Sequence, residues 1–153
     1  MKESLDKAKE ELRRVDHLTY VSLKYTRTVD IILSIIERMV AAYGFIIDAL
    51  LKKAKEDKKI DSIPDRDFLK GELVKNTYDD EIFHENMNLY FLLRKLKNAE
   101  CEKSNEYRRH VTMTSEIDGK TINVDIDIIT DYYKKIQNFI KYVEELIYDR
   151  KND

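Results

Sequence analysis

The chain of 153 residues is 42% hydrophobic and 38% charged, with a formal net charge of −2, three Gly and one Pro. This length suits one domain with a single core, and the composition argues against disorder and favours long helices over a turn-rich β protein. A pI near 6.0 excludes a general attraction to nucleic acid or anionic lipid, so such binding would need a local patch.

The single cysteine, Cys101, excludes an intrachain disulfide and a multi-cysteine metal site. It fits a reducing compartment, so we expect a cytoplasmic protein without a disulfide partner. The composition, rich in Lys, Glu, Ile and Tyr and without Trp, is similar to that of thermophile proteins.

Two helices are expected in the N-terminal part. Apolar residues recur at three- and four-residue spacing over residues 3–15, which predicts a short amphipathic helix. Residues 18–56 then continue a helical pattern that would be about 58 Å long, with Gly44 permitting a bend or a close backbone approach. A polar stripe on this helix is expected to face solvent: Lys24, Arg27, Asp30, Ser34, Glu37 and Arg38.

The most apolar stretch, residues 29–51, reaches the length of a membrane span. Four charged residues interrupt it, each costing about 2.5 to 3.5 kcal/mol near a bilayer centre: Asp30, Glu37, Arg38 and Asp48. We therefore expect a buried soluble helix and no membrane partner.

Pro64 is placed to open a short helix over residues 65–76, and Thr77 with Asp80 matches a capping box that starts the next helix near residue 78. If that helix continues to residue 108, its core stripe comprises Ile82, Leu89, Leu92, Leu96, Ala99 and Tyr107. A nearly opposite stripe comprises Phe83, Met87, Tyr90, Arg94, Cys101, Asn105 and Arg108. Its apolar start predicts an interface, and its basic end predicts binding to an anion.

Residues 110–126 give the clearest local pattern, because Asp118-Gly119 separates two β-favouring runs. The pattern predicts a β-hairpin in which Met113 lies opposite Val124 and both are buried. Asp127 is expected to cap a final helix that ends near residue 149. The core stripe of this helix comprises Ile129, Tyr132, Ile136, Phe139, Val143 and Leu146.

The predicted fold is therefore mainly α. It is an up-and-down helical bundle of four to five helices, with one β-hairpin inserted before the C-terminal helix, in a single domain over residues 1–153.

The densest group of chemically reactive side chains in the sequence is formed by three consecutive residues, Arg108, Arg109 and His110. An arginine can bind phosphate bidentately and a histidine exchanges protons near neutrality, so these three residues are the candidate catalytic group. Arg94, Arg108 and Arg109 are the candidate anion or nucleic-acid contacts. A structural alternative stays open, because arginines suit a helix end and Glu102 and Glu106 are close enough to pair with them.

The other chemistry-bearing residues show no recognised pattern. His17, His84 and His110 are scattered and lack metal-ligand spacing, and the sequence contains no Gly-rich phosphate loop and no nucleophile elbow. We therefore expect no metal and no cofactor.

The helical plan followed by "YFLLRKLKNAECEKSNEYRRHVTM" resembles the HEPN superfamily (higher eukaryote and prokaryote nucleotide-binding domains). The resemblance implies an up-and-down bundle that dimerises. Many members are metal-independent ribonucleases within toxin or defence systems. Their active members share an Arg and a His separated by four to six residues, whereas here Arg108 and Arg109 directly precede His110, and Arg94 is farther away.

The expected function is that of a HEPN-like intracellular protein that binds a partner protein or RNA without catalysis. Two alternatives stay open: a metal-independent ribonuclease using Arg108 or Arg109 with His110, and a structural or oligomerisation subunit. We expect a homodimer through Phe83, Met87 and Tyr90, because a bundle of this size is not expected to cover every apolar stripe from within.

Overall fold

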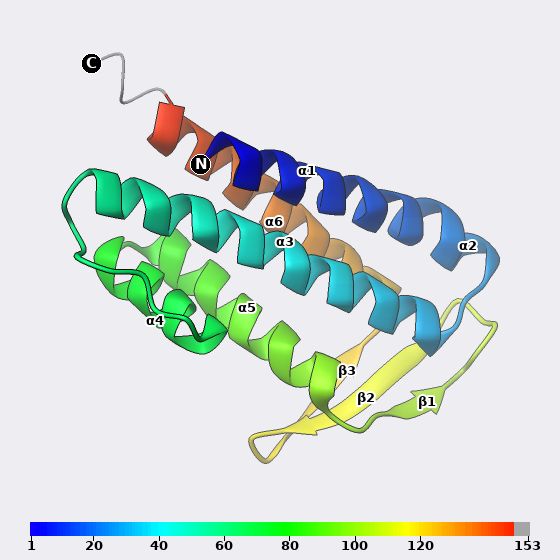
Figure 1. Ribbon diagram of the computed structural model, residues 1–153. Coiled ribbons are helices and arrows are strands. Elements are labelled where there is room, and N and C mark those ends of the chain that lie inside the picture. Colours follow the sequence, from blue (N-terminus) through cyan, green and yellow to red (C-terminus); the bar gives the residue numbers. More distant parts are fainter. Residues whose placement is uncertain (149–153) are drawn as a thin grey trace.

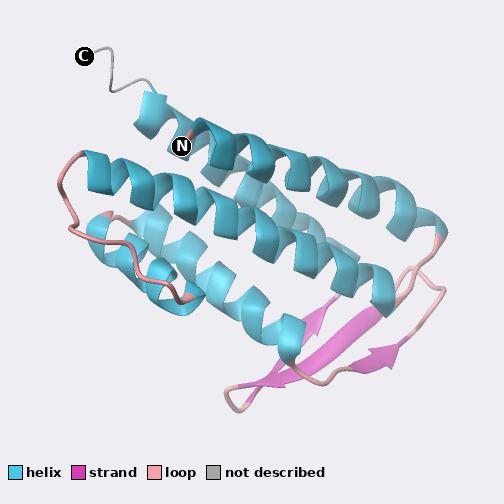
Figure 2. Ribbon diagram, in the orientation of Figure 1, coloured by secondary structure: helices cyan, strands magenta, loops and turns pink. Residues whose placement is uncertain are grey.

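A computed structural model describes residues 1–148, which form an up-and-down helical bundle with a small antiparallel sheet packed at one end (Figures 1 and 2). The mainly α fold with a hairpin before the last helix is confirmed. The start of the first helix and the end of the last one lie side by side at the end of the bundle opposite the sheet.

The N-terminal helical stretch runs without interruption through α1 (Lys2–His17), the π-helical segment η1 (Leu18–Ser22) and α2 (Leu23–Tyr25). The predicted separation between a helix over residues 3–15 and one over residues 18–56 is wrong, because the helical stretch is interrupted at residues 26–28 instead. Thr26 leaves the helical conformation, and Thr28 is extended with its Oγ1 accepting the N–H of Ile31 at 3.3 Å. Thr28 therefore caps the next helix, as its short polar side chain favours.

Helix α3 (Val29–Glu56) is the central element and contacts α1, α4, α5 and α6. It lies between α1 and α5 in Figure 1 and carries the largest share of the buried core. Gly44 does not interrupt the helix, and no atom of another element lies within 4 Å of where its Cβ would be. The expected polar stripe is divided by the break, because Lys24 and Arg27 precede α3.

Helix α4 (Asp67–Thr77) confirms the predicted short helix, and α5 (Glu81–Asn98) follows it. The N-cap of α5 is Asp80, whose Oδ1 accepts the N–H of Phe83 at 2.9 Å. The capping box from Thr77 and the start near residue 78 were therefore wrong by a few residues. Extension of this helix to residue 108 was also wrong, because Ala99 is extended and the chain enters the sheet.

The predicted interface stripe on α5 is buried inside the chain. Phe83, Met87 and Tyr90 are 1%, 0% and 2% exposed, whereas Ile82 and Tyr107, which were expected in the core, are 41% and 76% exposed. Helices α3, α4 and α6 all contact α5, so the single chain does cover that face. The prediction that these three residues form an exposed interface is wrong.

The sheet contains β1 (Glu102–Ser104), β2 (Thr112–Ile117) and β3 (Lys120–Val124) in the order β1-β2-β3. The predicted hairpin register is confirmed, because Met113 pairs with Val124 and both are fully buried. Asp118 and Gly119 take φ values of 52° and 79°, as a type I′ turn requires. Strand β1 was not predicted.

Helix α6 (Ile126–Tyr148) completes the bundle. Its N-terminal N–H groups are capped by Asp125, whose Oδ1 accepts the N–H of Ile128 at 2.9 Å, and not by the predicted Asp127. The buried positions are Ile129, Tyr133, Ile136, Phe139, Ile140, Val143 and Ile147. The predicted Tyr132 and Leu146 are only half-buried, and residue 149 lies outside the described residues.

Within residues 1–148, none of the helices combines the length and the apolar character needed to cross a membrane.

Candidate anion-binding site

The loop of residues 105–111 links β1 to β2 and folds against the junction of α2 and α3. The backbone N–H of Tyr107 donates to the carbonyl of Arg27 at 2.6 Å, and the carboxylate of Glu106 accepts the N–H of Val29 at 3.0 Å. Asn105 and Tyr107 have φ values of 54° and 67° in the left-handed region, which Asn adopts readily but a bulky residue such as Tyr rarely does. The two bonds across the junction hold this strained conformation in place.

This arrangement separates Glu106 from the arginines that follow it. Its Oε2 atom caps the N-terminus of α3, and within residues 1–148 Glu106 forms no ion pair with Arg108 or Arg109. Neither arginine takes part in an ion pair within residues 1–148, and both side chains are exposed. The helix-end explanation of these arginines is therefore wrong, because α5 ends before them.

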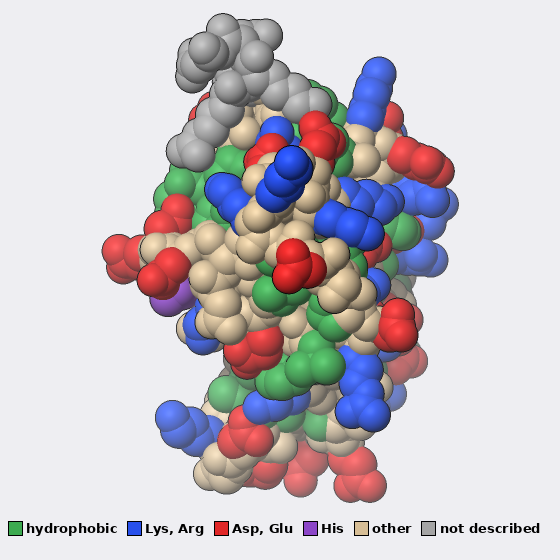
Figure 3. All heavy atoms as spheres, turned by 60° about the vertical axis from the view of Figure 1, so that its left-hand side comes forward, with side chains coloured by type: hydrophobic (Ala, Val, Ile, Leu, Met, Phe, Trp, Pro, Cys, Tyr) green, Lys and Arg blue, Asp and Glu red, His purple; other side chains and the backbone are tan. Residues whose placement is uncertain are grey.

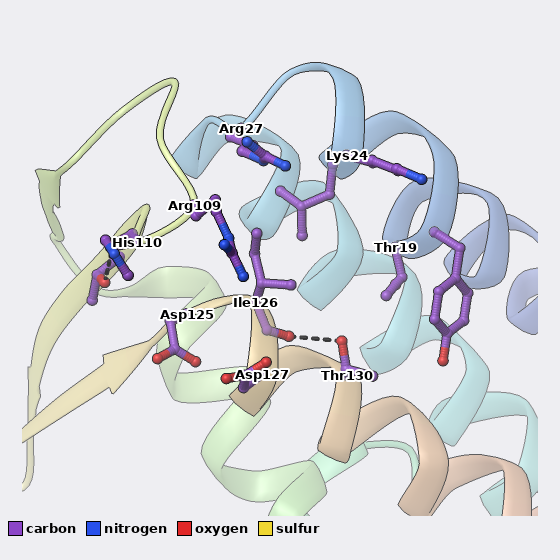
Figure 4. A pocket seen from close by; sticks show the side chains of 12 residues that line it. Thr19, Lys24, Arg27, Arg109, His110, Asp125, Ile126, Asp127 and Thr130 are labelled. Carbon is purple, nitrogen blue, oxygen red and sulfur yellow. Dashed lines mark hydrogen bonds between the residues drawn. The ribbon is translucent and has the colours of Figure 1, made fainter.

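A pocket of about 410 Å³ opens beside this loop (Figure 4). Four parts of the chain meet there: the helical stretch η1–α2, Arg27 in the α2–α3 junction, the residues before and at the start of β2, and the N-terminal turns of α6. The lining residues are Thr19, Tyr20, Leu23, Lys24, Arg27, Arg109, His110, Thr112, Asp125, Ile126, Asp127 and Thr130.

Three permanent cations, Lys24, Arg27 and Arg109, line the pocket. Among the residues that the structure describes, none of the three takes part in an ion pair. Nε of Arg27 is buried without a hydrogen-bond partner, and Oγ1 of Thr19 is in the same state. The pocket therefore presents positive charge, whereas these two buried atoms are not accessible from it.

Two carboxylates, Asp125 and Asp127, lie at the α6 side of the pocket, away from Lys24 and Arg27 in Figure 4. Asp125 is engaged as the α6 cap. The three cations outnumber the two carboxylates by one, without counting His110. The site is thus bipolar, with its cationic side formed by α2 and the α2–α3 junction.

The structure separates the predicted site residues into three groups. Arg109 and His110 line the pocket, and the carbonyl of His110 accepts the Thr112 hydroxyl at 2.8 Å. Arg108 is exposed and does not line it. Arg94 lies in another depression, beside Phe68 and Phe91, and its guanidinium carbon is 5.6 Å from the centre of the Tyr90 ring.

Most of the pocket lining was not predicted from the sequence. Lys24 and Arg27 were predicted only as part of a polar stripe that faces solvent. Thr19, Asp125 and Asp127 were not predicted as site residues. One usable signal was present, since Thr26 and Thr28 flank Arg27 and both favour leaving a helix. That signal could have shown that Arg27 sits in a junction.

Within the described part of the chain, no cluster of three or more His, Cys, Asp or Glu side chains is arranged to hold a metal ion. Comparison with protein-family models, curated proteins and solved structures finds no match to any of them.

Proposed function

We propose that this protein binds single-stranded RNA at the bipolar pocket without catalysing a reaction. The observation that carries the proposal is that Lys24, Arg27 and Arg109 line one pocket without ion-pair partners among residues 1–148. A site with an excess of positive charge attracts the phosphate backbone of nucleic acid.

Exposed tyrosines beside the cations support RNA over a simple anion. Tyr20 lines the pocket and is 47% exposed. Tyr25 and Tyr107 are 83% and 76% exposed, and the backbone of Tyr107 is bonded to Arg27. Bases of a single strand stack on such rings, with about 1 to 3 kcal/mol per base. Cations interleaved with aromatic side chains are the usual composition of single-strand binding surfaces.

The attraction must be local, because the whole chain carries a net charge of −2. Figure 3 shows acidic and basic side chains interspersed over one face of the molecule, without a large field of one sign there. Binding is therefore expected to depend steeply on salt and on a few named cations.

Fluorescence anisotropy with an unstructured RNA at several salt concentrations tests the proposal. The double variant Lys24→Ala, Arg109→Ala should bind more weakly and show a shallower salt dependence, by about 0.7 in log–log slope for each lost phosphate contact. The control is Lys2→Ala with Lys55→Ala, which removes the same charge from exposed positions at the other end of the bundle. Equal losses in both variants would contradict a local site.

A ribonuclease is the second candidate, and the observation that favours it is that Arg109 and His110 line the same pocket. Arg109 would stabilise the charge of a transition state, and His110 would act as general acid or base. RNA cleavage in the presence of a chelator, abolished in His110→Ala, would replace the non-catalytic proposal with this one.

The remaining expectations stay predictions. They are the HEPN-like relationship, a cytoplasmic location, a protein partner and a homodimer. The homodimer is no longer supported by Phe83, Met87 and Tyr90, since these residues are buried within the chain. Light scattering at micromolar concentration tests whether the protein is a dimer. A structural subunit would show no RNA binding in the anisotropy experiment.

A further inference from the structure

A second depression, of about 380 Å³, lies between α1 and α6, where these two helices contact each other. We call it the α1–α6 depression. It is farther from the sheet than the bipolar pocket, since its lining comes from residues 9–16 and 133–144 (Figure 1). Its charged lining residues are Lys9, Arg13, Asp16, Lys141 and Glu144. Cations therefore outnumber carboxylates by one, as they do in the bipolar pocket.

Both carboxylates of the α1–α6 depression are engaged by neighbouring side chains. Oε2 of Glu144 pairs with Nζ of Lys9 at 2.8 Å. Oδ1 of Asp16 accepts a hydrogen bond from the hydroxyl of Tyr133 at 2.9 Å. These contacts leave the other two cations of the depression without a carboxylate partner.

Those cations, Arg13 and Lys141, are exposed and take part in no ion pair within residues 1–148. Lys134 is in the same state and lies between the two sites on α6. It follows Thr130 of the bipolar pocket by four residues and precedes Lys141 by seven, so the three share one face of the helix. Positive charge thus continues from one site to the other.

Tyr20 joins the two sites. It lines the bipolar pocket, is 47% exposed, and its ring centre is 6.0 Å from that of Tyr133, which lines the α1–α6 depression. Tyr133 is only 4% exposed and its hydroxyl is bonded to Asp16, so it gives Tyr20 a fixed support. The exposed part of the Tyr20 ring can stack on a base, as aromatic side chains do in single-strand binding proteins.

The spacing of the cations suits several consecutive nucleotides. Lys24 of the bipolar pocket and Arg13 of the depression lie on one helical stretch without interruption, about 16 Å apart at about 1.5 Å per residue. Stacked nucleotides of one strand repeat about every 3.4 Å, so about five of them cover this distance. Surfaces that bind single strands commonly accommodate about 4 to 16 nucleotides.

We infer that a single strand of RNA continues from the bipolar pocket across Tyr20 into the α1–α6 depression, with a base on Tyr20 and phosphates beside Arg13 and Lys141. The inference rests on the proposed RNA binding and adds to it a second contact area and the length of RNA that fills both. Phosphates match the cations that have no ion-pair partner, and a base matches the exposed ring.

The experiment measures fluorescence anisotropy with two oligouridylates, a trinucleotide and an RNA of about ten nucleotides, at several salt concentrations. The longer RNA fills both sites, so it should bind the wild-type protein more tightly and with a steeper salt dependence. Tyr20→Leu should weaken the binding of both RNAs, because the ring borders both sites.

The decisive variant is Arg13→Ala with Lys141→Ala. It should bind the longer RNA severalfold more weakly, with a salt slope shallower by about 1.4 for two lost phosphate contacts, and should bind the trinucleotide as the wild type does. The matched control is Lys55→Ala with Lys135→Ala, which removes the same charge from exposed positions outside both sites. The side chain of Lys135 points about 100° away from that of Lys134 around α6. This control should bind both RNAs as the wild type does.

The outcomes separate the inference from the proposed function. Equal effects of the decisive variant and its control on the longer RNA, or an equal loss of both RNAs in the decisive variant, would overturn the inference and leave RNA binding in place. No binding of any RNA would overturn both. An acidic peptide that binds more tightly than the longer RNA, and that the decisive variant weakens, would overturn RNA as the occupant of the depression.

Discussion

The carboxylate of Glu106 accepts a hydrogen bond from the backbone N–H of Val29 at 3.0 Å, across 77 positions of the chain. A side chain of the β1–β2 loop thus caps the N-terminus of the central helix. The bond stabilises α3 and at the same time places Arg109 and His110 beside Arg27.

Replacing Glu106 should affect both stability and RNA binding. Glu106→Ala removes a cap and a favourable charge–dipole interaction, so we expect the free energy of unfolding to fall by about 1 to 2 kcal/mol in urea titrations. Hydrogen exchange at the Val29 amide should accelerate, and RNA affinity should fall because the loop loses an anchor. Glu106→Gln, which keeps an acceptor oxygen, should lose less. The exposed Glu102→Ala serves as control, and equal effects of both alanine variants would contradict this role.

A charge at Met113 should destabilise the protein severely. Met113 is fully buried opposite Val124, so Met113→Lys places an unpaired cation in the core and should cost on the order of 3 to 5 kcal/mol. Glu116→Lys, on the exposed face of the same strand, should change stability by less than about 0.5 kcal/mol. Thermal unfolding measures both, and a stable Met113→Lys protein would show that this face is not packed in solution.

The two helical glycines should respond oppositely to alanine. Gly44 has open space where a Cβ would lie, so Gly44→Ala should raise the free energy of unfolding by about 0.5 to 1 kcal/mol. At Gly71 the added Cβ would lie 2.7 Å from Cε1 of Phe91, whose ring contacts Phe68 and Tyr90. Gly71→Ala should lower stability by about 1 to 3 kcal/mol through overpacking. Equal urea midpoints for the two variants would contradict the tight packing of α4 on α5.

Stability should fall in alkali because of the buried tyrosines. Burial raises the pKa of Tyr78 and Tyr90 to about 12, and it raises the pKa of Tyr43 well above the usual 10.0. Above pH 10 the unfolded chain loses phenolic protons that the folded chain keeps, so the unfolded state binds fewer protons and stability decreases with rising pH. The contribution is complete below pH 10 and is lost between about pH 10 and 12 for Tyr78 and Tyr90.

Urea midpoints and phenolate absorbance, followed together from pH 9 upward, measure this effect. Tyr90→Phe removes one shifted group and should flatten the alkaline loss, whereas Tyr25→Phe, at a residue that is 83% exposed, should not. Titration of every tyrosine near pH 10 without loss of stability would show that these rings are more hydrated than the structure indicates.

Local patterns account for the parts of the fold that the sequence predicted. The hairpin register follows from alternation on both sides of Asp118-Gly119, a turn that needs two residues with positive φ. The helices follow from apolar periodicity, and most of the core face of α6 was assigned correctly for the same reason. Interactions between residues a few positions apart determine these features, so no tertiary information is needed.

The sequence-based predictions were wrong where contacts with distant segments override the local preference for a helix. Residues 99–108 contain good helix formers, yet Glu102–Ser104 is a strand because β2 offers it a partner edge. The outer face of α5 looked unpartnered because nothing in its own sequence shows that α4 and α6 cover it. Tertiary contacts of this kind routinely override helix propensity.

The helical class, the hairpin and the adjacent positions of Arg109 and His110 follow from neighbouring residues, so they could be predicted from the sequence. The pocket could not, because its lining comes from residues 19–27, 109–112 and 125–130, which meet only when the chain folds. Hydrogen bonds such as that from the Val29 N–H to the Glu106 carboxylate join these distant segments, and no periodic pattern in the sequence marks them.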